Sequence, residues 1–395
     1  MYLVGFEALH AVPIGRDRRR CRIQCGVQEI WGAFKPQPES RAIPLLKSQI
    51  KTPALVVDLD AMEANLTKMA AFFAQGTSRL RPHYKNHKCV ALARRQLAAG
   101  AIGITCATLG EAEALARNGI GGILLANEIA GATAIERLVQ IARVTDIMVG
   151  VDNERTVAAL SAASARAKVP LSVVVDVNTG MGRCGVLPGE PVLALAQLAV
   201  AQGLRVRGVI GYEGHCVRLA PGPDKVKAVH QAMGKLVDSA NLARTHGLPM
   251  EIVSAGGTGT YSISGRFPGV TEIQGGSYLL MDTDYQTVCP DFEPAISLLG
   301  TVISRSGNDR LILDIGLKEI SGERGLPVLK NADGAKLRKL NAEHAIVDIV
   351  DPNFPAQVGD QLEIWVHYSD ATVNLHRHMY GLRDGRVEET FLFES

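Results

Sequence analysis

The stretch ALVVDLDAMEANLTKMAAFFA, residues 54–74, joins a short run of apolar and β-branched residues to a longer segment with helical spacing. In the second part, apolar side chains recur every three or four residues, at Met62, Leu66, Met69 and Phe73. That spacing places them on one face of a helix, whereas the first part is typical of a strand. The stretch therefore predicts a strand followed directly by a helix.

The same alternation continues along the chain. Eight further runs are predicted as strands, at residues 80–85, 102–108, 122–128, 146–152, 171–177, 205–213, 250–257 and 270–278. Helix-like stretches rich in Ala, Leu, Lys and Arg separate these runs, and alternating βα units are typical of a parallel sheet. Eight such units predict an α/β fold, a (β/α)8 TIM-type barrel.

The character of the sequence changes after about residue 286, where helical spacing fades. Apolar runs such as HAIVDIV, residues 344–350, are bounded by Gly, Asp, Asn and Pro, which is typical of antiparallel strands. We therefore expect a barrel at residues 49–285 and a C-terminal antiparallel β domain at residues 286–395. Residues 1–48 are predicted to be a poorly ordered N-terminal extension, with a targeting or interaction arm as the alternative.

The bulk composition excludes several classes of protein. The 395 residues include 42 basic and 40 acidic side chains, so the formal net charge of +2 is too small to recruit nucleic acid. The chain contains no run of about 20 apolar residues, the length that a membrane span requires. The seven cysteines show no CxxC spacing, which argues against a disulfide framework and a zinc knuckle. A location in the reducing cytoplasm is predicted.

Barrel enzymes place their chemistry at the carboxyl ends of the strands, and Lys85 lies at the end of the first predicted barrel strand. Since side chains alternate along a strand, we expect His83, Lys85 and His87 to share one side. A desolvated lysine has a lowered pKa and can form a Schiff base with a carbonyl group. The alternative is a lysine that is paired with a carboxylate at the barrel rim.

Two glycine-rich loops follow the seventh and eighth predicted strands. They are SAGGTGT at residues 254–260 and GGSY at residues 275–278. Glycine backbone amides can approach an anion closely, and barrels commonly bind phosphate after these two strands. A phosphate cradle beside a Schiff-base lysine indicates a pyridoxal phosphate site. An aldolase that uses the lysine without a cofactor would show the same features.

The segment RPHYKNHK, residues 81–88, resembles the RPHxKxHK signature of the D-threonine aldolase and D-serine dehydratase family, pyridoxal phosphate enzymes related to alanine racemase. The resemblance runs from about residue 50 to the C-terminus, through DVNTGMGRCG at 176–185, GYEG at 211–214 and DIGLKEISGERGLP at 314–327. It implies that Lys85 carries the cofactor, that Arg183 lies near its ring and that Tyr212 meets the pyridine nitrogen.

The resemblance also implies which residues bind phosphate, namely Gly257, Thr258, Gly276, Ser277 and Tyr278. His83 and His215 are the candidate acid–base groups beside Lys85 and Arg183. Near the C-terminus, VHYSDATVNLHRH at residues 366–378 is similar to the segment in which the family binds a divalent metal.

For this metal, which would be Mn, Mg or Zn, we predict His367 and Asp370 as ligands. Tyr368 stands where the family has its histidine, and the alternative interpretation of the segment is a polar strand and turn.

These features together predict a lyase that depends on pyridoxal phosphate and a divalent metal and acts on D-β-hydroxy-α-amino acids. The leading hypothesis is retro-aldol cleavage to glycine and an aldehyde. The alternative is β-elimination from D-serine or 3-hydroxy-D-aspartate, and an amino-acid racemase or a non-catalytic carrier of the cofactor are further possibilities. A homodimer is expected from the resemblance, and neither nucleic acid nor a membrane is expected as a partner.

Overall fold

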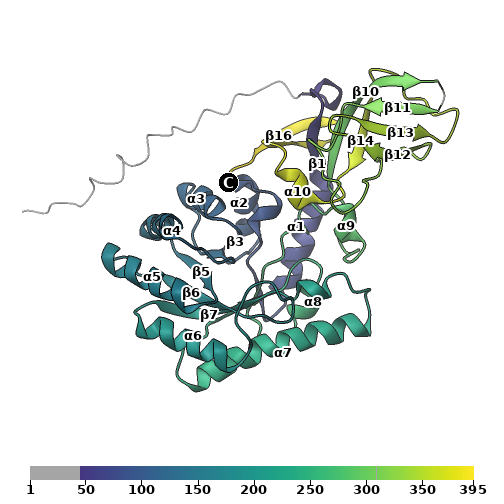
Figure 1. Cartoon of the computed structure of the whole chain (residues 1–395). Helices are drawn as coiled ribbons and strands as arrows, with labels where there is room; N and C mark the ends of the chain where they lie inside the picture. Colours follow the sequence, from purple (N-terminus) through teal and green to yellow (C-terminus); the bar gives the residue numbers. More distant parts are fainter. Residues whose placement is uncertain (1–44, 308) are drawn as a thin grey trace, which may run out of the picture. The chain divides into compact units, whose positions relative to one another are not determined.

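The computed structural model describes residues 45–307 and 309–395 and contains two eight-stranded sheets. The first sheet is entirely parallel and is curled, with helices along its outside (Figure 1). Its strands are β2 (Arg79–Leu80), β3 (Ile104–Cys106), β4 (Ile123–Leu125), β5 (Ile147–Val151), β6 (Ser172–Asp176), β7 (Arg205–Gly211), β8 (Ile252–Ala255) and β9 (Glu272–Ile273). All eight lie within the runs predicted from the sequence, or begin one residue before them, and most of them are shorter.

The strand order in this sheet is β2-β9-β8-β7-β6-β5-β4-β3. The segment after β2 approaches β3, because His83 forms a parallel bridge with Thr105. The backbone N–H of Thr105 also donates to the carbonyl of Pro82 at 2.9 Å. A few backbone contacts beyond the end of β2 therefore link β2 and β3, the two strands at the ends of this order.

Helices connect the parallel strands, as the sequence predicts. They are α2 (Val90–Ala98), α3 (Leu109–Arg117), α4 (Ala132–Val144), α5 (Glu154–Ala167), α6 (Glu190–Ala201), α7 (Pro223–Thr245) and the short α8 (Tyr261–Ser264). Side chains of Thr108 and Asn153 accept backbone N–H groups at the starts of α3 and α5, which satisfies donors that have no partner within the helix. The chain therefore returns to the same edge of the sheet at each strand.

The helix predicted at the start of the fold is α1 (Leu59–Ala74), capped by the carboxylate of Asp58. Met62, Met69 and Phe73 are buried on its inner face, as the spacing predicts, and Leu66 is partly buried. The strand before it, β1 (Ala54–Asp58), does not belong to the parallel sheet. It pairs antiparallel with β10 and parallel with β15 of the second sheet, so part of the predicted barrel segment at residues 49–285 belongs to the β domain.

The second sheet is antiparallel at every pairing except that of β1 with β15. Its other strands are β10 (Ile296–Ser306), β11 (Arg310–Leu313), β12 (Ala335–Leu340), β13 (Ala345–Ile349), β14 (Gln361–Trp365), β15 (His378–Arg383) and β16 (Arg386–Leu392). Two short helices lie between the sheets or within this region, α9 (Thr283–Gln286) and α10 (Ser369–Val373). The predicted antiparallel domain is therefore mostly antiparallel, with one parallel contact made by an N-terminal strand.

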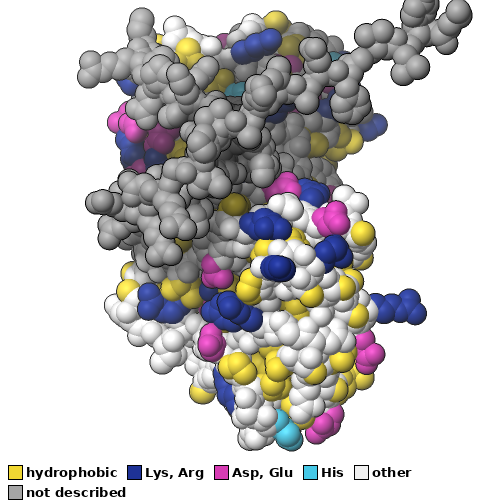
Figure 2. Space-filling view, turned by 90° about the vertical axis from the view of Figure 1, so that its left-hand side faces the viewer, with side chains coloured by type: hydrophobic (Ala, Val, Ile, Leu, Met, Phe, Trp, Pro, Cys, Tyr) yellow, Lys and Arg dark blue, Asp and Glu magenta, His cyan; other side chains and the backbone are white. Residues whose placement is uncertain are grey.

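Of the predicted extension, residues 1–44 lie outside the described residues. The first described element is a 3-10 turn, η1 (Lys47–Gln49). Within the described residues, no helix is long and apolar enough to cross a membrane. Basic and acidic side chains are both spread over the described part of the face in Figure 2, in agreement with the formal net charge of +2.

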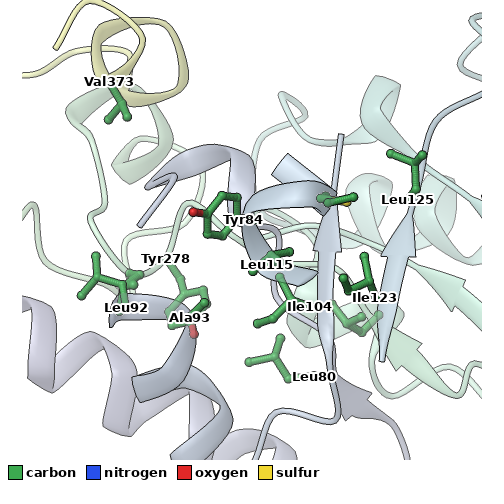
Figure 3. Packing of buried hydrophobic residues seen from close by; sticks show 14 of the residues in the cluster. Leu80, Tyr84, Leu92, Ala93, Ile104, Leu115, Ile123, Leu125, Tyr278 and Val373 are labelled. Atoms are coloured by element: carbon green, nitrogen blue, oxygen red, sulfur yellow. The ribbon is translucent and has the colours of Figure 1, made fainter. Parts of the chain in front are cut away.

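The main core combines residues between the parallel sheet and the helices outside it with residues of the second sheet, among them Ile296, Leu298 and Ile364. Figure 3 shows Leu80, Leu92, Ile104 and Ile123 packed together from β2, α2, β3 and β4. A separate buried cluster contains one residue from each of the strands β4 to β8, namely Leu124, Met148, Val174, Ile210 and Ile252. Ile210 also lines the cavity described next, so this second cluster forms an apolar floor beneath it.

Candidate active site

A cavity of about 290 Å³ opens at the carboxyl ends of the parallel strands. This is the end at which parallel α/β folds bind ligands. Most of the residues predicted from the sequence line it, namely His83, Lys85, Arg183, Tyr212, Gly257, Thr258, Gly276 and Ser277. Asn86, Asp176, Gln274 and Tyr285 also line the cavity and were not among the predicted site residues. Asn86 adjoins Lys85 in the signature segment, which was the one signal that could have identified it.

Lys85 lies in a 3-10 turn, η2 (Tyr84–Asn86), and not in a strand. Its Nζ lies 2.9 Å from Oδ2 of Asp370, and its side chain is 45% exposed. Burial lowers the pKa of Lys85, but the attraction of the Asp370 carboxylate outweighs this and raises the pKa above its ordinary value. In this structure the lysine is paired with a carboxylate and its pKa is raised, not lowered as expected. The role of Lys85 as the cofactor lysine stays a prediction.

Asp370 is held in place from two sides. Asn86 donates to Oδ1 of Asp370 at 2.9 Å and to Oγ of Ser369 at 2.8 Å. Burial raises the pKa of the Asp370 carboxyl, but the charge of Lys85 and the Asn86 hydrogen bond lower it by more, so the net shift is downward. Asp370 lies in the first turn of α10. The lysine turn is thus fixed by a helix from the C-terminal part of the chain.

The two histidines around Lys85 have different environments. His83 accepts the backbone N–H of Lys85 on Nδ1 at 3.4 Å, and burial together with the Lys85 charge lowers its pKa to about 3. His87 does not line the cavity but is buried, with its ring 3.1 Å from Oε1 of Gln96. The prediction that His87 shares the side of Lys85 is wrong, because β2 ends at Leu80 and the strand alternation does not continue into the turn.

The two glycine loops meet at the wall of the cavity, where a Cβ on Gly275 would lie 3.5 Å from the backbone N of Thr258. A Cβ on Gly257 would lie 3.2 Å from the Tyr212 ring, and one on Gly276 would lie 2.7 Å from the His83 carbonyl oxygen. Gly256 has a φ of +73°, which L side chains rarely adopt. The glycines are therefore required for the close approach of backbone segments around the cavity.

Two side chains support these loops from outside the cavity. Tyr278 donates its backbone N–H to Oγ1 of Thr258 at 3.0 Å, while its ring is fully buried and its hydroxyl accepts from Gln96. Its side chain does not line the cavity, and the predicted contact of Tyr278 with the cofactor stays a prediction. Glu213 is also buried and accepts the Gly256 N–H at 3.2 Å.

Polar rings and a guanidinium complete the wall. Arg183 lies with its guanidinium 5.8 Å from the centre of the Tyr212 ring. Tyr212 and Tyr285 share a hydrogen bond, and burial raises the pKa of both hydroxyls, that of Tyr285 to about 12. Burial and the neighbouring Glu128 raise the pKa of Asp176 to about 8. The two tyrosines and Asp176 are therefore neutral hydrogen-bonding partners at neutral pH, whereas the Arg183 guanidinium is charged.

His215 is a further predicted residue that does not line the cavity. It is exposed in the turn η3 (Gly214–Cys216), where its ring lies against Gly180. Because its exposed ring lies against Gly180 and outside the cavity lining, an acid–base role of His215 stays a prediction.

The cavity fits pyridoxal phosphate, the cofactor that the resemblance implies. It combines a lysine amine, an arginine and a tyrosine with two loops of exposed backbone N–H groups and hydroxyls. A divalent metal does not fit in the same way. Nδ1 of His367 shares a hydrogen bond with Oγ1 of Thr283 at 2.8 Å, and Asp370 forms an ion pair with Lys85. Among residues 45–307 and 309–395, no group of three or more His, Cys, Asp or Glu is arranged to hold a metal.

The chain matches two family models. Residues 57–284 match the model described as "Alanine racemase, N-terminal domain", and residues 295–382 match "Putative serine dehydratase domain". The two matches correspond to the parallel sheet and to the larger part of the second sheet.

Three similar proteins cover most of the chain. D-threonine aldolase of Arthrobacter sp is 36% identical over 91% of this chain and 96% of its own length. 3-hydroxy-D-aspartate aldolase of Paracoccus denitrificans is 33% identical over 87% of this chain and 91% of its own length. The structure of D-threo-3-hydroxyaspartate dehydratase from Delftia sp. HT23 superposes with a TM-score of 0.81 and 28% identity, over 88% of this chain and 99% of that one. The chain therefore belongs to the family of D-threonine aldolase and the 3-hydroxy-D-aspartate aldolases and dehydratases, which is built on the alanine racemase N-terminal domain.

Proposed function

We propose that this protein is a pyridoxal phosphate-dependent lyase that cleaves D-β-hydroxy-α-amino acids by a retro-aldol reaction, giving glycine and an aldehyde. One observation carries the proposal: the amine of Lys85 stands in a cavity walled by two glycine loops, and its partner Asp370 is 2.9 Å away. The two aldolases similar to this chain support the reaction type.

Each lining residue has a role that its contacts suggest. Lys85 would bond to the cofactor, and Gly257, Thr258, Gly276 and Ser277 would hold its phosphate. When bound, the cofactor supplies an electron sink for the negative charge that develops at Cα.

Since Nδ1 of His83 accepts a backbone N–H, its proton is assigned to Nε2. With a pKa of about 3, the ring stays neutral and donates a hydrogen bond rather than taking up a proton. Asp370 orients Nζ of Lys85, whose amine would accept the proton of the substrate's β-hydroxyl as the Cα–Cβ bond breaks and would return a proton to Cα.

β-Elimination is the second candidate, and the similarity to the dehydratase structure favours it. No step of either proposal is routed through a metal, because residues 45–307 and 309–395 hold no group of three or more His, Cys, Asp or Glu arranged to bind one. The test incubates the cofactor-loaded protein with D-threonine and with D-serine, with and without added Mn²⁺. We expect glycine and acetaldehyde from D-threonine, and none from the Lys85→Ala variant. An oxo acid and ammonia without any glycine would overturn the retro-aldol proposal.

We also propose four finer points that the sequence predicts. The curled parallel sheet is a (β/α)8 barrel, supported by the backbone contacts between the segment after β2 and β3. The protein is a cytoplasmic homodimer that acts on small D-amino acids. Gel filtration with light scattering tests the dimer, and a mass of a single 42.2 kDa chain would contradict it.

A further inference from the structure

Two arginines converge on one carboxylate at the edge of the site. Arg218 donates from both terminal nitrogens to Asp284, with Nη1 at 2.5 Å from Oδ1. Nη1 of Arg324 lies 3.9 Å from Oδ2 of the same carboxylate, too far for a hydrogen bond. The arginine side chains are 39% and 38% exposed, whereas that of Asp284 is 10% exposed. Asp284 is thus satisfied by Arg218, and Arg324 keeps most of its donors available.

The neighbouring carboxyl groups do not neutralise this second guanidinium. Asp282 accepts from the backbone N–H and hydroxyl of Ser369 and from the backbone of Tyr285, and burial raises its pKa. Asp370 is paired with Lys85. Among the described residues, Asp284 at 3.9 Å is the only carboxylate that forms an ion pair with Arg324.

Two tyrosines connect the arginines to the reacting amine. The Arg218 guanidinium lies 5.7 Å from the centre of the Tyr285 ring, which lines the cavity. The Arg324 guanidinium lies 4.6 Å from the centre of the Tyr368 ring and is hydrogen-bonded to the Tyr368 hydroxyl. Tyr368 is in turn close enough to Lys85 to raise its pKa. Arg324 is therefore separated from the Lys85 amine by one aromatic side chain.

We propose that Arg324, held beside Arg218, binds the side-chain carboxylate of the substrate, so that the enzyme prefers D-β-hydroxy-α-amino acids with an acidic side chain. The proposal rests on the proposed lyase function and names its substrate class. A guanidinium matches a carboxylate with two parallel hydrogen bonds. A substrate that ends in a methyl group makes neither bond, and a site built for hydrogen bonding discriminates strongly against a substrate that lacks them. Tyr368, which stands where the family has its histidine, holds the arginine in place.

Arg324→Gln is the variant that tests the proposal, because Arg218→Gln would leave Asp284 buried without its partner. The selectivity is the ratio of kcat/KM for 3-hydroxy-D-aspartate to kcat/KM for D-threonine. We expect the variant to lower this ratio by about tenfold or more, the loss typical of a charged hydrogen bond. The matched control is Arg338→Gln, which breaks an exposed ion pair with Asp348 and should leave the ratio unchanged.

A binding measurement tests the subsite without turnover. D-aspartate and D-alanine lack the β-hydroxyl and cannot undergo the retro-aldol reaction. Their dissociation constants from the wild-type holoenzyme, read from the cofactor absorbance, should favour D-aspartate, and Arg324→Gln should remove most of that preference. If the variant does not fold, the wild-type holoenzyme alone tests the subsite. It should bind D-aspartate more tightly than D-alanine, and added salt should reduce this difference.

The outcomes separate the two proposals. Equal losses of kcat/KM for both substrates would mean that Arg324 binds the α-carboxylate or has a structural role, and would overturn the subsite. A wild-type enzyme that prefers D-threonine and binds D-alanine as tightly as D-aspartate would also overturn it. Cleavage of neither substrate by the wild-type holoenzyme would instead refute the proposed function.

Discussion

Replacing Asp370 with asparagine tests whether this carboxylate controls the protonation of Lys85. The Nζ to Oδ2 distance of 2.9 Å corresponds to an attraction of about 1.4 kcal/mol in bulk water and about 6 kcal/mol at an effective dielectric constant of about 20. Because Lys85 is 45% exposed, solvent screening favours the lower part of that range. Asparagine removes the charge, while its carbonyl oxygen can still accept the hydrogen bond from Asn86.

The sign of the effect follows from the cause of the pKa shift. Asp370 raises the pKa of Lys85, whereas burial lowers it. Removing the carboxylate therefore leaves the effect of burial unopposed by Asp370, and the pKa of Lys85 falls. Since only the unprotonated amine attacks an aldehyde, a loss of 1.4 kcal/mol raises its fraction about tenfold at a pH below the lysine pKa. Asp370→Asn should therefore combine with pyridoxal phosphate about tenfold faster than the wild type at neutral pH.

The assay mixes cofactor-free protein with pyridoxal phosphate and follows the absorbance of the bound cofactor across a range of pH. Glu343→Gln is the control, because it removes a carboxylate from an exposed ion pair with Lys318 that does not line the cavity. A rate in Asp370→Asn equal to or below that of the wild type would refute the reasoning. An unchanged rate together with loss of a Mn²⁺-dependent activity would instead support the metal ligand predicted from the sequence.

Three further predictions follow from the contacts around the cavity. Gly276→Ala should weaken cofactor binding at least tenfold in equilibrium titration, because its Cβ would lie 2.7 Å from a backbone carbonyl oxygen, whereas Gly234→Ala has open space and should bind normally. Tyr278→Phe removes the acceptor of the Gln96 Nε2 group and should cost about 1 kcal/mol in urea unfolding, with kcat/KM within about twofold of wild type. A large loss of activity in Tyr278→Phe would support its predicted role in the site. The kcat/KM of the wild type should fall above about pH 8 as Asp176 loses its proton, and Asp176→Asn, a permanently neutral donor, should lack this decline.

The sequence by itself determined the succession of strands and helices and the identity of the central lysine. The apolar spacing of α1 and the βα alternation are local properties, and local spacing decides which face of an element is buried. The glycine loops were equally readable, because glycine is needed wherever backbones approach closely. For these features the described structure adds lengths and boundaries.

Only the tertiary structure decided the electrostatics of the site and the pairing of β1. The pKa of Lys85 is raised because α10, far along the chain, brings Asp370 within 2.9 Å, and no spacing rule reports that distance. The exposure of His215 and the burial of the Tyr278 ring likewise depend on the path of the backbone after each strand ends. β1 was readable as a strand, but its partners are chosen by packing between distant segments. Local sequence patterns specify which side chains lie on the buried face of a helix or strand. The distances between elements, which only the tertiary structure sets, decide which charged groups form ion pairs.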